Sequence, residues 1–359
     1  MTDPLLQVIA GLAGDGALTR AALAPLSGLE RGAAARIAEL LNTLPAERQR
    51  EIVESLVGEA ERSFDLDFGL VYRALLKHTD ATIRRLCIEG LVEDVHLDLV
   101  NILIRLLEND PDISVRAAAA DSLGRFVYAG EIDEIPAGHA RSVRQALERT
   151  FQQLSTTPEV ARRALESLAY INDDAIKAMI DRAYSADASV VRQSAVFAMG
   201  RSADTYWADI VLAELYSDDP AMRYEAARAC GELQLDEAVE PLERMISERD
   251  AEVRYMAVQA LGEIGTPEAR KALERHSETD DPDLAEAIEE ALAESSLADM
   301  TFEMLEVNPL DTDFVPDEPD AQETEEDVDA DQEAFRDEFF EYTDEDEDDD
   351  WPDEFLSLD

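Results

Sequence analysis

Apolar residues recur at helical spacing between Asp250 and Gly265, and this stretch sets the pattern for the middle of the chain. Positions three, four and seven apart lie on one face of an α-helix, so the stripe predicts a helix with one buried face. Asp250 is placed to cap the start of this helix, and Gly265 is placed to end it in the left-handed conformation. The stripe consists of Val253, Met256, Ala257, Ala260, Leu261 and Ile264.

The same pattern returns at a nearly fixed period, marked by an arginine near the start of each predicted helix. Arg192, Arg223 and Arg254 follow one another at intervals of 31 residues. The interval from Arg116 to Arg162 is 46 residues, which indicates an insertion in one repeat. A fixed period of this length is typical of solenoids, in which each repeat buries its apolar face against its neighbours.

Seven helix pairs fit this register, and no strand pattern competes with them. The sequence therefore predicts an all-α fold, a right-handed α-solenoid or superhelix of helix pairs over residues 64–298. Residues 129–138 contain Gly130, Pro136 and Gly138 and are expected to form a surface loop. The expected pairs are 66–78 with 80–92, 97–108 with 111–128, 140–154 with 158–170, 173–185 with 189–200, 206–216 with 220–233, 237–247 with 251–264, and 267–276 with 282–293.

The two ends of the chain depart from the repeat pattern. Residues 1–63 read as helices at 19–24, 29–44 and 45–62, and we expect them to cap the open end of the solenoid. Residues 299–359 carry 28 Asp or Glu against the single Arg336, a composition too charged to bury a core. We expect this acidic tail to be disordered.

The repeats resemble a known family in the motif Asp-x-x-Val/Ile-Arg-x-x-Ala followed by Leu-Gly. The best matches lie at 112–124, 219–231 and 250–262, and the motif is similar to the short HEAT-like repeats of phycobilin lyase subunits. The resemblance covers residues 66–293. It implies that arginine and aspartate tie neighbouring turns together and that the second helix of each pair lines a concave face. It also leaves open a role as a lyase-like or chaperone-like subunit acting on a tetrapyrrole or its carrier protein.

Charge and composition restrict the partners. Residues 1–298 hold 55 acidic and 30 basic side chains, so both parts of the chain repel nucleic-acid phosphate and anionic lipid and favour a basic partner. No apolar run is long enough to span a bilayer, and no secretory signal is evident, so we expect a cytoplasmic protein without membrane contact.

Catalytic and metal-binding patterns are weak. His78, His96, His139 and His276 are dispersed, and none is followed by glutamate, in contrast to the iron-binding HEAT-like hydroxylases. We expect no enzyme activity, no metal and no cofactor.

Candidate binding residues lie one, five and nine positions after the repeat arginines, on a face distinct from the apolar stripe. Aromatic residues and arginine dominate interface energetics, although the same aromatics could instead wedge between neighbouring repeats. The candidates on this face are Phe197, Arg201, Tyr224, Arg228, Tyr255 and Gln259. The acidic tail adds a linear motif of Phe335, Phe339, Phe340, Trp351 and Phe355, which is predicted to bind a partner or to contact the solenoid in cis.

The sequence thus predicts a non-catalytic scaffold or adaptor that binds another protein on its concave face. A solubilising role is the alternative for the tail.

Overall fold

The computed structural model describes residues 4–306 with the exception of residues 15 and 64. Throughout this part of the chain the regular secondary structure is helical, and no strand occurs in it. The described residues up to Met300 belong to one compact unit. The all-α prediction is confirmed.

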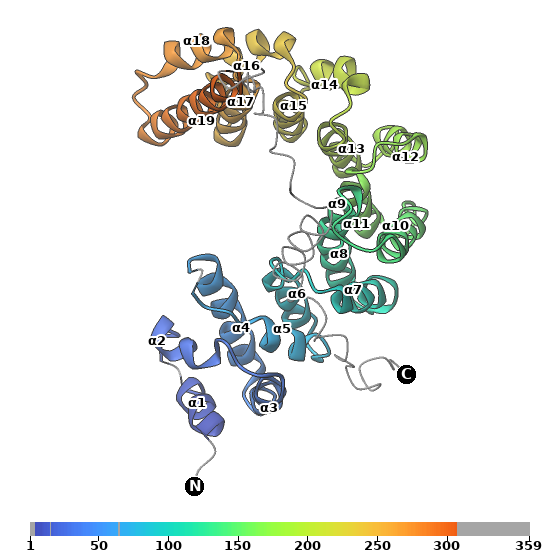
Figure 1. The fold of residues 1–359 in the computed structure, drawn as a ribbon, viewed down its shortest axis with the longest axis vertical. Helices are drawn as coiled ribbons and strands as arrows, with labels where there is room; N and C mark the ends of the chain where they lie inside the picture. Colours follow the sequence, from blue (N-terminus) through green and yellow to red (C-terminus); the bar gives the residue numbers. More distant parts are fainter. Residues whose placement is uncertain (1–3, 15, 64, 307–359) are drawn as a thin grey trace, which may run out of the picture. The chain divides into compact units, whose positions relative to one another are not determined.

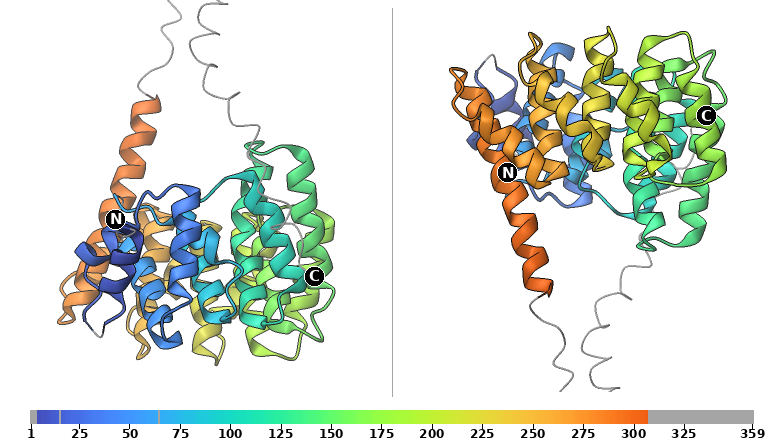
Figure 2. Two further views of the ribbon diagram at one scale, coloured as in Figure 1. Left: turned by 90° about the horizontal axis from the view of Figure 1, so that it is seen from below. Right: turned by 90° about the horizontal axis from the view of Figure 1, so that it is seen from above.

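Helix pairs build the compact unit in two layers (Figure 1). The first-helix layer contains α3 (Arg31–Leu41), α5 (Gly69–Leu75), α7 (Leu97–Asn109), α10 (Ala137–Phe151), α12 (Asp174–Tyr184), α14 (Ala208–Glu214), α16 (Val239–Met245) and α18 (Pro267–His276). The second-helix layer contains α4 (Ala46–Glu61), α6 (Ala81–Gly90), α8 (Ile113–Ser122), α11 (Pro158–Leu168), α13 (Ser189–Arg201), α15 (Pro220–Glu232), α17 (Ala251–Ile264) and α19 (Pro282–Glu306). Each second helix from α4 to α15 packs on the next second helix, and the first helices α5, α7, α10, α12, α14 and α16 pack on their pair mates, so the chain is an α-solenoid of helix pairs. Figure 2 shows these helices side by side from two further directions.

Short helices complete the amino-terminal end and two of the turns. They are α1 (Pro4–Leu12), α2 (Arg20–Leu23), η1 (Ala24–Leu26), η2 (Thr205–Trp207) and η3 (Asp236–Ala238). In this region α3 packs on α5 and α4 packs on α6, so the last two helices of the predicted cap extend the two layers. The division into residues 1–63, 64–298 and 299–359 stays a prediction.

The insertion between the second and third repeats contains less loop than the sequence predicts. The helix that begins at Ile113 breaks at Leu123 and continues as α9 (Gly124–Glu131), and α10 begins at Ala137. Only residues 132–136 connect them, so the predicted loop over 129–138 is wrong at both ends. The reason is packing, because α9 buries Phe126 and Val127 and contacts both α10 and α11.

The predicted caps and apolar stripe of α17 are confirmed. The Asp250 carboxylate accepts hydrogen bonds from the backbone N–H groups of Glu252 at 3.0 Å and Val253 at 3.3 Å. Gly265 adopts the left-handed conformation with φ 64°. All six residues of the apolar stripe are buried.

The repeat arginines hold the turns together, as the resemblance implies, but with other acids than the aspartates beside them. Arg84 donates from Nε and Nη2 to the Asp110 carboxylate at 2.8 and 2.7 Å and from Nη1 to the His78 carbonyl at 2.7 Å. Arg223 binds Glu248 and the Ser217 carbonyl in the same way. In these two repeats the guanidinium therefore ties its own turn to the turn of the next repeat, whereas the neighbouring aspartates cap helices.

Glycines in the second helices allow the next second helix to approach closely. A Cβ built on Gly200 would lie 2.7 Å from Ala229 Cα, and one built on Gly231 would lie 2.9 Å from Ala260 Cα. Real Cβ atoms do not come this close to backbone, so close packing explains why these positions accept the low helix propensity of glycine.

Candidate protein-binding face

The candidate binding residues lie on the side of the second-helix layer that faces away from the first-helix layer. We call this side the second-helix face. Phe197 and Arg201 belong to α13, Tyr224 and Arg228 to α15, and Tyr255 and Gln259 to α17. Five of the six are half-buried, and Gln259 is exposed. The structure divides them into a cluster around Phe197 and a groove between α15 and α17.

Phe197, Arg201 and Arg228 form the first group. The Arg228 guanidinium lies 3.6 Å from the centroid of the Phe197 ring, and that of Arg201 lies 4.3 Å from the same centroid. Arg201 also lies 4.9 Å from the centroid of Tyr170, which in turn contacts Tyr128 edge-on at 5.3 Å. These rings and cations form a continuous stack from α9 to α15, so Phe197 joins neighbouring repeats as the structural interpretation of the aromatics anticipated.

Two glutamates balance Arg228 within this stack. Its Nε donates to Glu225 at 3.2 Å and its Nη1 donates to Glu232 at 3.1 Å. Burial nevertheless outweighs the nearby guanidinium and raises the pKa of both carboxyls. Two of its three nitrogens are thus paired within the fold, while Nη2 is buried without a hydrogen-bond partner among the described residues, so Arg228 is less available to a partner than the sequence suggests.

Tyr224, Tyr255 and Gln259 line a groove between α15 and α17, which we call the tyrosine groove. Its volume is about 780 Å³. The lining also includes Pro220, Val253 and Met256 as apolar surface, together with Ala221 and the carboxylates of Asp219, Glu225, Asp250 and Glu252. Apolar and aromatic surface beside a few fixed charges is what a peptide-binding groove requires.

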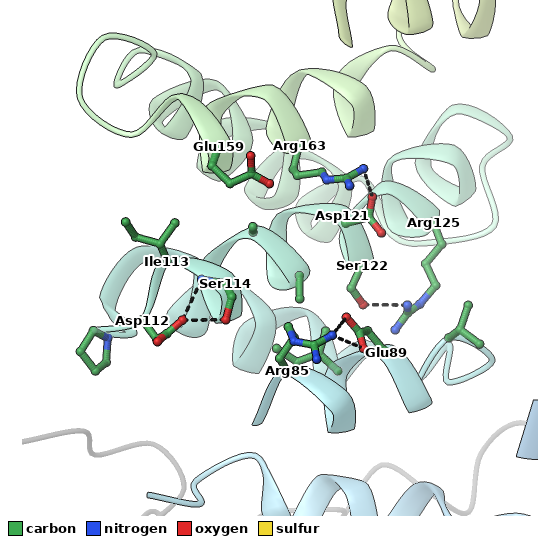
Figure 3. Close-up of a pocket in the computed structure, with 15 residues that line it drawn as sticks. Arg85, Glu89, Asp112, Ile113, Ser114, Asp121, Ser122, Arg125, Glu159 and Arg163 are labelled. Atoms are coloured by element: carbon green, nitrogen blue, oxygen red, sulfur yellow. Dashed lines mark hydrogen bonds and ion pairs between the residues drawn. The ribbon is translucent and has the colours of Figure 1, made fainter. Parts of the chain in front are cut away.

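A second groove, of about 830 Å³, lies on the same face between α6, α8 and α11 (Figure 3). We call it the arginine groove, because Arg85, Arg125 and Arg163 line it. Val92 and Ile113 add apolar surface and are 62% and 49% exposed. Exposed aliphatic side chains beside arginines are typical of protein interfaces.

The arginines of this groove differ in how their charges are satisfied. Figure 3 shows Arg85 against Glu89, with Nη1 2.6 Å from Oε1, and Arg163 reaching toward Asp121 at 3.8 Å. Arg125 donates to Ser122 Oγ at 2.8 Å, and its Nη2 is buried without a hydrogen-bond partner among the described residues. Burial lowers the pKa of Arg125 to about 10. Its Nε donates to the Asp94 carbonyl at 3.2 Å, so Arg125 is held within the fold at the edge of the groove.

The sequence analysis did not predict the arginine groove, although residues that line it follow the same rule as the candidates. Positions one, five and nine after Arg84 and Arg116 include Arg85, Glu89 and Arg125, all of which line the groove. Applying the rule to all the repeats, and not only to the last three, would have found these residues.

The remaining chemistry of the described residues is sparse. No group of three or more His, Cys, Asp and Glu side chains is arranged to hold a metal ion within residues 4–306, gaps excepted. Cys87 and Cys230 are free and buried, and burial raises the pKa of both thiols. In the same part of the chain, no helix has the length and apolar character needed to cross a membrane. The tail motif of Phe335, Phe339, Phe340, Trp351 and Phe355 lies outside the described residues.

Comparison with known families agrees with the helix pairs. The profile of HEAT repeats matches residues 71–150 and 208–293. These two segments of the chain consist of HEAT repeats. A search of curated proteins found no match.

Solved structures with a similar arrangement of helices come from several kinds of protein. Human deoxyhypusine hydroxylase is 16% identical over 74% of this chain and 97% of its own, with a TM-score of 0.33. YibA of Escherichia coli is 15% identical over 78% of this chain and 98% of its own, with a TM-score of 0.44. The CpcE and CpcF complex of phycocyanin lyase from Nostoc sp. PCC7120 is 19% identical over 63% of this chain and 93% of that chain, with a TM-score of 0.41. These similarities concern the fold alone.

Proposed function

We propose that this HEAT-repeat chain is a non-catalytic scaffold or adaptor that binds another protein on its second-helix face, the face that the resemblance predicts to be concave. One observation carries the proposal: two open grooves lie on the same face, and both combine apolar surface with charged or aromatic side chains. Repeat solenoids use such extended surfaces to bind protein segments. The acidity of the chain favours a basic partner and opposes direct nucleic-acid contact.

Affinity capture from native lysate tests this proposal, with the full chain as bait. Replacing Val92 and Ile113 by aspartate places charge on the exposed apolar side chains of the arginine groove without opening the core, and should abolish capture. The matched control replaces Val95 and Ile132, which are 69% and 45% exposed, lie in turns and are not among the residues that line the groove. If both variants capture the partner equally well, binding on this face is contradicted. It is also contradicted if neither the native chain nor the control variant captures any protein.

The acidic tail enters the proposal as a linear binding segment with Phe335, Phe339, Phe340, Trp351 and Phe355 as apolar anchors. Docking in cis would be helped by a tether, which raises the effective concentration to the order of millimolar. Arg201 is the better contact for the tail than Arg228, because Arg228 already pairs with Glu225 and Glu232.

The test of cis docking adds a peptide of residues 330–359 to a chain ending at residue 298, at low salt. Resonances of α13 should shift, and the shifts should diminish in high salt as screening increases. An Arg201→Gln variant should lose them. Unchanged spectra would leave the tail with binding in trans or with a solubilising role.

The tetrapyrrole alternative remains testable but is not favoured by any contact in the described residues. Incubating the purified chain with free bilin and recording visible absorbance addresses it directly. A red-shifted band that persists through desalting would require the proposed function to be replaced.

A further inference from the structure

The tyrosine groove is acidic around its whole lining. Four carboxylates face it, and no Arg, Lys or His is among its lining residues. Asp219 and Asp250 are fixed as helix caps by backbone N–H groups. Glu252 is exposed on α17, and Glu225 is half-buried on α15, where it accepts a hydrogen bond from Arg228. The groove therefore carries an excess of negative charge at positions that the fold holds in place.

The two tyrosines lie at the same register of consecutive repeats, each one position after a repeat arginine. Both rings pack partly against the core, which fixes their orientation and reduces the entropy lost on binding. Burial and the neighbouring carboxylates of Glu225 and Glu252 raise the pKa of the Tyr224 hydroxyl. The carboxylates thus lie near the ring that an incoming side chain would meet.

The nearest cation leaves these rings largely available. Arg254 lies 6.0 Å from the centroid of Tyr255, at the outer limit of a cation–π contact, while its Nη2 donates to Asp281 at 3.0 Å. Arg228 is held against Phe197 and two glutamates on the other side of Glu225. An external cation would meet aromatic faces and carboxylates together.

The same register position differs along the solenoid. The residue that follows the repeat arginine is Arg85 or Arg163 in the arginine groove. In the tyrosine groove it is Tyr224 or Tyr255. The arginines of the first groove are balanced by Glu89, Asp112, Asp121 and Glu159, whereas the tyrosine groove has four carboxylates and no cation in its lining. A cationic segment is therefore attracted more strongly to the tyrosine groove. The charge pattern therefore selects where along the second-helix face such a segment binds.

We infer that the tyrosine groove binds an arginine- or lysine-bearing segment of the protein partner, with its cation against the rings of Tyr224 and Tyr255 and paired with Glu225 and Glu252. This inference rests on the proposed function and gives the partner a chemical class. Nucleic acid does not fit, because its phosphates would face four carboxylates. Pro220 and Ala221, which are exposed in the groove lining, provide apolar surface for the methylene stem of the basic side chain.

The experiment uses the full chain labelled with ¹³C at methionine methyl groups and a nine-residue peptide of alternating arginine and alanine. Met256 lines the groove and reports binding there, whereas Met199 is buried elsewhere and serves as the internal reference. The assignment comes from a Met256→Leu variant. A peptide with glutamate in place of arginine is the control for charge.

Two sets of variants separate the contributions. The double variant Tyr224→Leu and Tyr255→Leu removes both aromatic rings. The double variant Tyr224→Phe and Tyr255→Phe keeps the rings and serves as its control. Glu225→Gln with Glu252→Gln removes two carboxylates from the groove. Its matched control, Glu237→Gln with Glu268→Gln, makes the same change of net charge at exposed positions outside the groove lining. Circular dichroism and thermal unfolding of every variant verify the fold.

The arginine peptide should shift the Met256 methyl resonance, and its affinity at the site reporting on Met256 should fall about tenfold in the leucine and groove glutamine variants. The phenylalanine and control glutamine variants should bind as the native chain does. If the peptide binds while Met256 does not move, it binds elsewhere on this acidic chain and the inference is wrong. A lysate partner captured equally by native chain and groove variants would also overturn this inference but leave the scaffold intact. Capture of no partner would instead overturn the scaffold.

Discussion

The Arg228 guanidinium stacks on the Phe197 ring at 3.6 Å from its centroid, although the two residues belong to consecutive repeats. The contact joins α13 to α15 on the second-helix face, outside the apolar core between the two layers. It therefore couples neighbouring repeats through the same face that is proposed to bind a partner. A stacked cation that is partly desolvated contributes about 1–2 kcal/mol.

Replacing Phe197 by leucine keeps apolar bulk and removes the ring, and should lower the free energy of unfolding by about 1–2 kcal/mol. Urea unfolding provides the measurement. A double-mutant cycle with Arg228→Gln should show a coupling of about 1 kcal/mol. The same cycle with Arg244→Gln, on α16 of the other layer, should show none, and equal coupling in both cycles would contradict a direct contact.

The period and the helix ends could be predicted from the sequence, because they depend on residues that are close along the chain. Asp250 and Gly265 act on their own helix, and the stripe between them follows from helix geometry. The role of Phe197 could not be predicted in this way, because its ring is covered by Arg228 from the next repeat and by Arg201 at the end of its own helix. Periodicity places a residue on a face but does not show what covers it.

The residues of the arginine groove follow the rule of positions one, five and nine, but the sequence does not show that they come together in one groove. Its lining comes from repeats on both sides of the insertion, and the 46-residue interval obscures the common register of Arg85 and Arg163. The folded packing of α8 against α11 restores that register in space. Sequence periodicity does not show which helices pack against each other across an insertion.

Replacing Arg84 by alanine should destabilise the solenoid by about 3–5 kcal/mol, because it leaves the buried Asp110 carboxylate unpaired. The side chains of Arg84 and Asp110 are 9% and 4% exposed. Lysine should not restore stability, since it cannot make the bidentate contact. Urea unfolding of Arg244→Ala is the control, because the exposed pair with Glu240 should contribute less than about 1 kcal/mol. Similar losses for both variants would refute the special role of the buried pair.

Replacing Gly231 by alanine should destabilise the chain by about 1–3 kcal/mol, because the new Cβ meets Ala260 backbone and the Glu263 carboxylate. Helix propensity alone predicts the opposite sign, a gain of about 1 kcal/mol. Gly58 supplies the matched control within α4, where the nearest atoms to an added Cβ belong to Arg62 at 3.8 Å. Thermal unfolding should show a lower Tm for Gly231→Ala and an unchanged or higher Tm for Gly58→Ala.

The last prediction concerns pH and the Glu232 carboxyl, which lies over Gly200 of the preceding repeat. Its Oε2 is buried without a hydrogen-bond partner among the described residues, and burial raises its pKa above the ordinary value of 4.5. A carboxyl with a raised folded-state pKa binds protons more readily in the folded chain. The ionised group therefore destabilises the fold increasingly as pH rises from about 4.5 through that pKa.

Glu232→Gln removes this charge and should raise the free energy of unfolding at pH 7.5, while the difference from the native chain should vanish near pH 4. The Glu243→Gln control should behave oppositely, because hydrogen bonds from Arg275 lower the pKa of Glu243 and make its ionised form stabilising. That variant should lose stability at pH 7.5 and approach the native chain in acid. Urea unfolding from pH 4 to 8 measures both, and a pH-independent effect of Glu232→Gln would show that burial of its charge does not limit the stability of this repeat interface.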